Sequence, residues 1–248
     1  MMKKVLVLTL LLGSVAFAEE IYATFNVKAD KEADLVLSST GLVQKIYVDV
    51  GDSVKRGEVL LELDNDDLKT SLVLAQKQID LAEVNLRFAK KAYERFVQVK
   101  DVVDEELFDQ YASDYERAKI KLADANANLA YKRSLFEKTR LKAPFSGVIA
   151  SREIELGDGV SSAKMETLFT LITPQKQKLV ATVDEKYWRK LKVGQTFSYV
   201  VGGSDQQYTG KISKIYPSID DKLRSVTVEV PAAALKVGLF GHGMIKAD

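Results

Sequence analysis

The fold is decided by the stretch LKTSLVLAQKQIDLAEVNLRFAKKAYERF, residues 68–96, in which apolar residues recur at alternating steps of four and three. Such a heptad seam is typical of an α-helix that packs along its whole length against a second helix. The sequence therefore predicts a long amphipathic helix in this stretch. Its seam consists of Leu68, Leu72, Ala75, Ile79, Ala82, Leu86, Ala89, Tyr93 and Phe96.

A second seam follows after a short interruption, and neither Gly nor Pro occurs between Gly57 and Pro144. The runs Asp64-Asn65-Asp66-Asp67 and Asp104-Glu105-Glu106 supply capping residues and acids at the two expected helix starts. The first run lacks the loop spacing of a calcium site, so capping is its predicted role. We expect an antiparallel coiled-coil hairpin over residues 65–138, with arms of about 34 residues and about 50 Å. The second seam consists of Phe108, Tyr111, Tyr115, Ala118, Leu122, Ala125, Leu129, Lys132 and Phe136.

A further apolar stripe lies off the first seam, at Leu74, Leu81, Val84 and Phe88. A hairpin of two helices cannot bury both stripes, so this second one needs another partner. Two interpretations remain open. The stripe contacts a neighbouring copy of the chain in a homo-oligomer, or it shields the base of the hairpin from solvent.

A repeated β pattern flanks the hairpin on both sides. Gly41-Leu42-Val43 leads after ten residues to Gly51-Asp52, and Gly147-Val148-Ile149 leads at the same interval to Gly157-Asp158. Alternating apolar residues and Gly-Asp turns predict that each copy forms a short β-hairpin. Neither copy can bury its apolar face alone. We therefore expect both to close into a flattened lipoyl-like β-sandwich, with residues 37–64 as its first half and 139–175 as its second.

Residues 176–248 contain further strand-like segments, separated by Gly and Pro, and a candidate short helix over 184–191. The upstream segment Ile21–Val27, within residues 19–36, is also strand-like and is expected to complete this β-barrel. The predicted fold class is mixed, mainly β with a long α-helical coiled-coil hairpin. It combines a lipoyl/biotinyl-like sandwich, split by the hairpin, with a small β-barrel domain. The downstream segments are residues 178–183, 196–201, 210–215 and 225–230.

Residues 1–18 have the three regions of a secretory signal peptide: Lys3-Lys4, the apolar run Val5–Leu12 and the small-residue pattern Ala16-Phe17-Ala18. The apolar run is shorter than the roughly 20 residues that a membrane span needs. We therefore expect export, cleavage after Ala18 and no transmembrane helix. Because the chain has no Cys, we also expect no disulfide and no lipid anchor on a modified Cys.

The composition argues against catalysis. The chain has no Cys and one His, His242, which excludes thiol chemistry and His-rich metal sites. Ser225 and His242 could form a hydrolase pair, but no Gly-x-Ser-x-Gly elbow accompanies them. With 36 Lys+Arg against 35 Asp+Glu, the net charge of +1 offers no attraction to nucleic acid. We expect no enzyme, no catalytic or cofactor-binding residue, no metal and no nucleic-acid partner.

The order of barrel strand, half-sandwich, helical hairpin, half-sandwich and barrel resembles the membrane fusion protein (HlyD-type) family, the periplasmic adaptors of tripartite efflux pumps. The resemblance covers nearly the whole chain after the signal peptide. Its motifs are Val48-x-x-Gly51-x-x-Val54-x-x-Gly57-x-x-Leu60, Thr139-Arg140-Leu141-Lys142-Ala143-Pro144-Phe145-Ser146-Gly147, Gly210-Lys211-Ile212-x-x-Ile215-x-Pro217 and Leu223-Arg224-Ser225-Val226.

This resemblance implies a periplasmic adaptor that self-associates into a tube. The tube would link an inner-membrane transporter to an outer-membrane channel protein for the transport of drugs or other small molecules. A hairpin with few heptads favours an RND-type transporter. Arg95, Val99 and Asp104 correspond to the positions at the hairpin tip with which the family contacts the channel, although Val99 stands for a Leu and Asp104 for a Ser.

The chain ends shortly after its last expected barrel strand, so we expect no membrane-proximal domain of the kind that longer relatives carry. The barrel would then contact the transporter itself, with Tyr187, Trp188 and Phe240 as the expected contacts. An alternative is an adaptor of an ABC-type exporter or secretion system. An alternative of another class is a lipoyl/biotinyl-type carrier, for which Lys164-Met165 offers a superficial motif, although the hairpin occupies the turn where a carrier lysine belongs.

Overall fold

The computed structural model describes residues 19–99, 104–204, 206–220 and 222–247. The expected signal peptide, residues 1–18, lies outside the described residues. The chain divides into two compact units. We call them the barrel unit, which joins the chain up to Lys31 with residues from Thr173 onward, and the hairpin unit, Glu32–Ile172.

The barrel unit is a single antiparallel sheet in the order β12-β11-β15-β1-β10-β14-β13. β1 lies between β15 and β10, which confirms that the upstream segment completes this domain. Its alternate residues Ile21, Ala23, Phe25 and Val27 are buried, as expected of a strand with one face on a core. The strands are β1 (Glu19–Ala29), β10 (Gln177–Asp184), β11 (Thr196–Val201), β12 (Gln207–Lys211), β13 (Lys214–Asp220), β14 (Ser225–Ala232) and β15 (Phe240–Ala247).

The expected strand over 210–215 is wrong, because β12 ends at Lys211 and β13 begins at Lys214. At this break Ile212 turns into the core, and its N–H donates to the carbonyl oxygen of Gln195 at 3.0 Å. The short helix was expected over 184–191. It is the 3₁₀ helix η2, Glu185–Lys190, and the Asp184 carboxylate caps it by accepting from the N–H of Lys186 at 2.9 Å.

The hairpin unit contains two four-stranded sheets, in the orders β2-β9-β7-β4 and β6-β5-β3-β8. They enclose a core that includes Leu60, Leu61, Ile149, Phe169 and Leu171. The strands are β2 (Glu32–Leu35), β3 (Gly41–Ile46), β4 (Ser53–Val54), β5 (Val59–Leu63), β6 (Arg140–Lys142), β7 (Gly147–Arg152), β8 (Gly159–Val160) and β9 (Phe169–Ile172).

The two halves of this sandwich are interlocked, which corrects the expectation that the strands of each copy pair only with one another before the copies close into a sandwich. β3 pairs with β5 of its own copy, but its other neighbour is β8 of the second copy. In the same way β4 of the first copy pairs with β7 of the second. The cause is the Gly-Asp turn of each copy, in which Gly51 (φ 94°) and Gly157 (φ 88°) adopt the left-handed conformation and direct the next strand into the opposite sheet.

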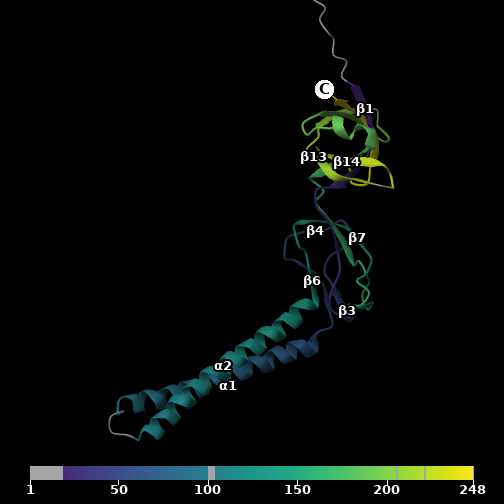
Figure 1. Cartoon of the computed structure of the whole chain (residues 1–248). Helices are drawn as coiled ribbons and strands as arrows, with labels where there is room; N and C mark the ends of the chain where they lie inside the picture. The colour runs from purple at the N-terminus through teal and green to yellow at the C-terminus, as the bar shows by residue number, and fades with distance from the viewer. Residues whose placement is uncertain (1–18, 100–103, 205, 221, 248) are drawn as a thin grey trace, which may run out of the picture. The chain divides into compact units, whose positions relative to one another are not determined.

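Between the halves, α1 (Asp66–Val97) and α2 (Glu105–Lys138) run antiparallel and side by side (Figure 1). With 32 and 34 residues, they are about 48 and 51 Å long. Every residue of both predicted seams is buried or half-buried, so the heptad interpretation is confirmed. The fold class is therefore confirmed as well: mainly β, with a sandwich split by a helical hairpin and a separate barrel.

The boundary between the units falls at residues 31/32 and 172/173, a few residues from the expected 36/37 and 175/176. The shift arises because β2 pairs with β9 in the sandwich, in the register Glu32↔Ile172 to Leu35↔Phe169, and does not extend the barrel strand. Among the described residues, no helix combines the length and apolarity that a membrane span requires.

Candidate interaction surfaces

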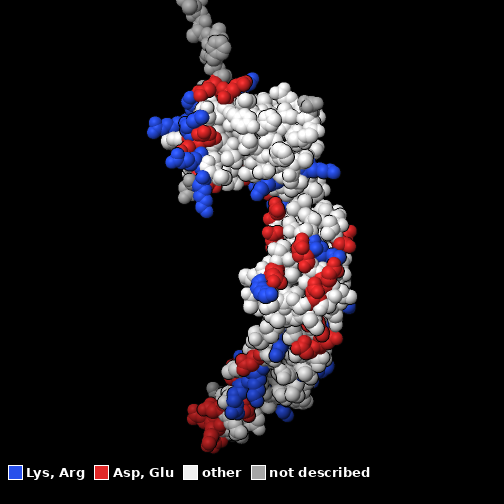
Figure 2. Space-filling view, turned by 90° about the vertical axis from the view of Figure 1, so that its right-hand side faces the viewer, with Lys and Arg blue, Asp and Glu red and all other residues white. Residues whose placement is uncertain are grey.

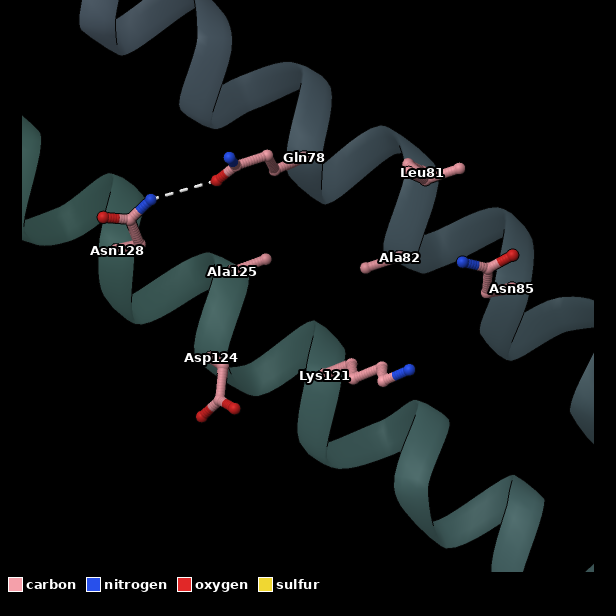
Figure 3. Close-up of a pocket in the computed structure, with 8 residues that line it drawn as sticks. All are labelled: Gln78, Leu81, Ala82, Asn85, Lys121, Asp124, Ala125 and Asn128. Carbon is pink, nitrogen blue, oxygen red and sulfur yellow. Dashed lines mark hydrogen bonds between the residues drawn. The ribbon is translucent and has the colours of Figure 1, made fainter.

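The middle of the hairpin carries a groove of about 470 Å³ between the two helices. Ala82 of α1 and Ala125 of α2 point toward each other across it, and Asn128 donates to the Gln78 side-chain oxygen at 3.1 Å beside them (Figure 3). Alanine at facing seam positions leaves space that larger side chains would fill. The groove is therefore bounded by alanine between the helices and flanked by polar side chains.

The off-seam stripe of α1 reaches this groove at Leu81. Leu74, Leu81 and Phe88 are 61%, 62% and 63% exposed, and Val84 is 38% exposed. Leu81 lines the groove of Figure 3, and Phe88 lines the next depression toward the distal end of the hairpin, together with Arg95. All four side chains of the stripe are thus exposed on α1.

At the distal end, Arg95 and Val99 line one depression together with Phe96 and Tyr111. Two of these lining residues pack on each other, since Phe96 stacks on Tyr111 with ring centroids 4.0 Å apart. Asp104 lies on the other side of residues 100–103, which are outside the described residues. It caps α2, because its carboxylate accepts from the N–H of Glu106 at 2.9 Å, as the sequence predicted.

The three barrel candidates do not form one surface. Trp188 of η2 is 54% exposed, whereas Tyr187 packs partly against the barrel core. Lys190 of the same helix pairs with Glu19 at the start of β1, but Phe240, 69% exposed, lies opposite Asn26 near the other end of that strand. Seven residues of strand separate these points, about 23 Å. Trp188 and Phe240 therefore mark opposite ends of the barrel.

A second surface on the barrel was not predicted. Phe240, His242 and Met244 are exposed at alternate positions of β15, next to exposed Tyr22 of β1. The rings of Tyr22 and His242 are 6.0 Å apart. Period-two spacing in this segment could have revealed the shared face.

Figure 2 shows a broad face of the barrel unit with almost no charged side chains, whereas both signs intermingle along the hairpin unit.

The base of the hairpin contains a hydrogen-bonded polar group of residues that we call the root cluster: Glu62, Asn65 and Thr139, which are buried, and Tyr47, which is exposed. The Asn65 side-chain N–H₂ donates to Glu62 Oε1 at 3.1 Å and to Thr139 Oγ1 at 3.0 Å. The Tyr47 hydroxyl donates to Glu62 Oε2 at 3.1 Å. Burial raises the pKa of the Glu62 carboxyl, but hydrogen bonds from Asn65 and Tyr47 and the nearby Lys69 outweigh it, so the pKa lies below its ordinary value.

Sequence reasoning missed the root cluster. It assigned Asn65 to the capping run, whereas in the structure its side chain makes no capping bond and donates to Glu62 and Thr139. The sequence held one local signal for this cluster. Asn65 stands among three carboxylates, Asp64, Asp66 and Asp67, that could cap the helix in its place, so Asn65 was not needed for capping.

The described part of the chain contains no assembled hydrolase, carrier-lysine or metal site. Three strand steps separate Ser225 of β14 from His242 of β15, about 14 Å, and Ser225 is buried. Lys164 lies in the loop between β8 and β9 and pairs with Glu166 at 3.6 Å, away from the turn that the hairpin occupies. Among the described residues, no three His, Cys, Asp or Glu gather as metal ligands.

Comparison with known proteins gives a consistent result. A family model described as "CzcB-like, barrel-sandwich hybrid domain" matches residues 31–173, more than half of the chain. The cation efflux system protein CzcB of Alcaligenes sp. is 27% identical over 224 residues, which cover 85% of this chain and 42% of CzcB. The macrolide export protein MacA of Yersinia pestis is 26% identical over 241 residues, covering 86% of this chain and 63% of MacA. The chain thus matches about half the length of these relatives.

Two solved structures share the fold. MacA from Actinobacillus actinomycetemcomitans superposes with a TM-score of 0.74 at 18% identity, covering 94% of this chain and 79% of that one. The membrane fusion protein Spr0693 from Streptococcus pneumoniae superposes with a TM-score of 0.73 at 17% identity, covering 92% and 99%.

Proposed function

Because the chain belongs to the membrane fusion protein family, with a CzcB-like barrel-sandwich hybrid domain, we propose that it is the periplasmic adaptor of a tripartite efflux pump. In this role it links an inner-membrane transporter to an outer-membrane channel. The observation that carries the proposal is the hairpin itself: two helices of about 50 Å inserted between the interlocked halves of a sandwich. Such an insertion provides reach.

The distal depression with Arg95 and Val99 is the proposed contact with the outer-membrane channel, and Asp104 flanks it at the start of α2. The contact is small for one copy, well below a standard interface of about 1,600 Å². Several copies acting together would supply the missing affinity.

Site-directed cross-linking tests this contact, and the chain suits it because it has no Cys. Val99→Cys carries a photoreactive maleimide at the distal end, and Lys138→Cys carries the same probe at the base of α2 as the matched control. In cells, capture of an outer-membrane channel by the first variant and not by the second supports the proposal. Equal capture by both, or capture of no channel, contradicts it.

The exposed stripe is the proposed contact between copies of the adaptor. Leu81→Glu introduces a charge on the stripe, and Ile120→Glu introduces the same charge on α2, away from the stripe, at a residue of nearly equal exposure (60%). We expect Leu81→Glu alone to lower the oligomer mass measured by sedimentation velocity in the presence of partner membranes. If both variants assemble as the parent does, the stripe has another role.

The transporter is proposed to be of the RND type and to contact the barrel unit through Trp188 or Phe240. Since these residues lie at opposite ends of the barrel, Trp188→Ala and Phe240→Ala separate the two possibilities. The variant that loses co-purification with the transporter identifies the end that docks. Recovery of an ABC protein would replace the RND assignment by an ABC-type exporter and leave the adaptor role intact.

The cargo is proposed to be an exported drug, another small molecule or a cation, as the names of the relatives suggest: cation efflux for CzcB, macrolide export for MacA and multidrug resistance for MdtA of Klebsiella pneumoniae. Deletion of the gene should lower the minimal inhibitory concentration of the exported compound. The panel to screen therefore includes divalent cations, macrolides and unrelated drugs. Fractionation of the same cells should place the protein in the periplasm.

A further inference from the structure

Asn65 occupies the N-cap position of α1 but does not cap the helix. Its carbonyl oxygen accepts from the N–H of Lys69 at 2.9 Å, as an N-cap carbonyl does. Its side chain, however, makes no bond to the first-turn N–H groups. Asn is among the best N-cap residues because that bond stabilises a helix start. Here the side chain is directed to other partners.

The residue is also fully buried, at 0% exposure, and its side-chain oxygen has no hydrogen-bond partner in the described residues. A missing cap and a buried unpaired acceptor both disfavour this arrangement. Natural sequences keep such local conflicts where geometry serves a function. The side chain therefore needs an explanation beyond helix initiation.

What the side chain does is join three elements. Its N–H₂ group bonds Glu62 of β5 and Thr139, which follows the last residue of α2. Thr139 in turn donates its hydroxyl proton to the Phe136 carbonyl oxygen at 2.7 Å. The start of α1, the end of α2 and the sandwich sheet thus meet at one amide. A backbone bond from Leu63 N–H to the Thr139 carbonyl at 3.0 Å supports the same junction.

A small change of helix direction at this junction would displace the distal end of the hairpin by a large distance. A tilt of about 5° at the root displaces the distal end of a helix about 48 Å long by about 4 Å. Such a displacement exceeds the length of a hydrogen bond, so a contact made at the distal end depends on the direction set at the root.

We propose that Asn65, together with Glu62 and Thr139, is a positioning joint that fixes the direction of the hairpin relative to the sandwich. The hydrogen bonds of this joint lie within the chain and do not depend on any partner protein. Only the benefit to distal docking rests on the proposed adaptor function.

The test measures direction and not stability. Spin labels at Lys91→Cys, near the distal end of α1, and at Glu153→Cys, on the sandwich, report the distance between hairpin and sandwich by pulsed electron resonance in the full chain. Both positions are exposed, and the chain brings no Cys of its own. The parent should give a single narrow distribution.

Asn65→Asp is the informative variant, because Asp is an equally good N-cap but cannot donate to Glu62 or Thr139. Thr139→Val keeps a similar volume and removes the hydroxyl that accepts from Asn65 and donates to the Phe136 carbonyl oxygen. We expect both to broaden the distance distribution by about 4 Å, the displacement produced by a tilt of about 5°, while helical circular dichroism stays at the parent level. Gln78→Ala, which removes only the bond to Asn128 in the middle of the hairpin, is the control and should leave the distribution narrow.

Narrow distributions in both root variants with intact helices would overturn the joint and leave Asn65 as a helix-start residue. Loss of helical signal in both would overturn it too, because the cluster would then serve global stability. Neither result bears on the adaptor function, whose tests are cross-linking and co-purification. If a root variant has a broadened distance distribution and still cross-links the channel, the joint and the adaptor function both stand, and only the benefit of the joint to distal docking is lost.

Discussion

Among the described residues each of the two units contains one buried carboxylate, and the two are held alike. Glu62 in the hairpin unit and Glu229 in the barrel unit are 6% and 8% exposed. Each accepts from a tyrosine hydroxyl, of Tyr47 at 3.1 Å and of Tyr216 at 2.9 Å. Each also has a lysine nearby: Lys69 lies 3.4 Å from Glu62, and Lys178 lies 2.9 Å from Glu229.

The difference lies in where the partners come from. Lys178 on β10, Tyr216 on β13 and Glu229 on β14 belong to neighbouring strands of one sheet. Partners of Glu62 belong to the residue that follows β3, Tyr47, to the start of α1 and, through Asn65, to the end of α2. The same chemistry therefore reinforces strand pairing in one unit and joins separate elements in the other. We expect loss of Glu229 to affect stability and loss of Glu62 to affect geometry.

The largest expected effect comes from Glu229→Ala. It leaves the Lys178 ammonium, 28% exposed, and the Tyr216 hydroxyl without their acceptor. Removing one partner of a largely buried pair should lower the free energy of unfolding by about 3 kcal/mol. Urea denaturation measures this change, and hydrogen exchange should rise in β10 and β14 but not in the sandwich. Equal exchange in both units would remove the contrast between them.

Glu62→Gln should lower the free energy of unfolding by less, about 1–2 kcal/mol, because the amide oxygen still accepts one of the hydrogen bonds. Its larger effect should be on the distance between hairpin and sandwich labels, which Glu229→Gln should leave unchanged. The comparison fails if Glu229→Gln broadens that distance as much as Glu62→Gln does.

Acid should weaken both carboxylate networks in the same direction. In Glu229 as in Glu62, burial raises the pKa, but hydrogen bonds to the carboxylate, here from Lys178 and Tyr216, outweigh it and leave the pKa below its ordinary value. The unfolded chain then binds more protons than the folded one. The contribution is present above the ordinary glutamate pKa and is lost as the pH falls through the lowered one. Unfolding free energies between pH 6 and 3 should fall less steeply in the Glu62→Gln/Glu229→Gln double variant than in the parent.

The smallest effect is expected from Lys214→Ala. Lys214 lies 3.6 Å from Glu229, but its side chain is 63% exposed, so solvent screens the pair. We expect a loss of about 0.5 kcal/mol or less. Lys178→Ala, at the same carboxylate but more buried, should cost clearly more. Equal losses of unfolding free energy in the two variants would show that burial does not determine the strength of these ion pairs.

Much of the fold could be predicted because its signals are local. The hairpin follows from the heptad period that can be read within residues 68–96 and within residues 108–136, and Asp104 caps α2 as its position near two further acids indicated. The exposure of Leu81 and Phe88 follows from the same period, since a residue off the seam faces away from the partner helix.

The rest depends on pairings between distant residues. Gly51 and Gly157 predict turns, but not that each turn sends the next strand into the other sheet. Asn65 meets Thr139, 74 residues further along, and no local pattern indicates that contact. The separation of Trp188 from Phe240 likewise depends on the pairing of β15 with β1, which joins residues 19–26 to residues 240–247.

The interlocked sandwich has a consequence for how the chain folds. Ser53 must find Val148 and Gly41 must find Val160 before either sheet is complete, so neither half is a folding unit. Closing loops of roughly a hundred residues is entropically costly and slow. Helices form from local contacts on a much shorter timescale. A hairpin that forms first brings Asn65 and Thr139 together and removes most of the loop between the two halves. The insertion that separates them in the sequence is then the element that allows them to meet.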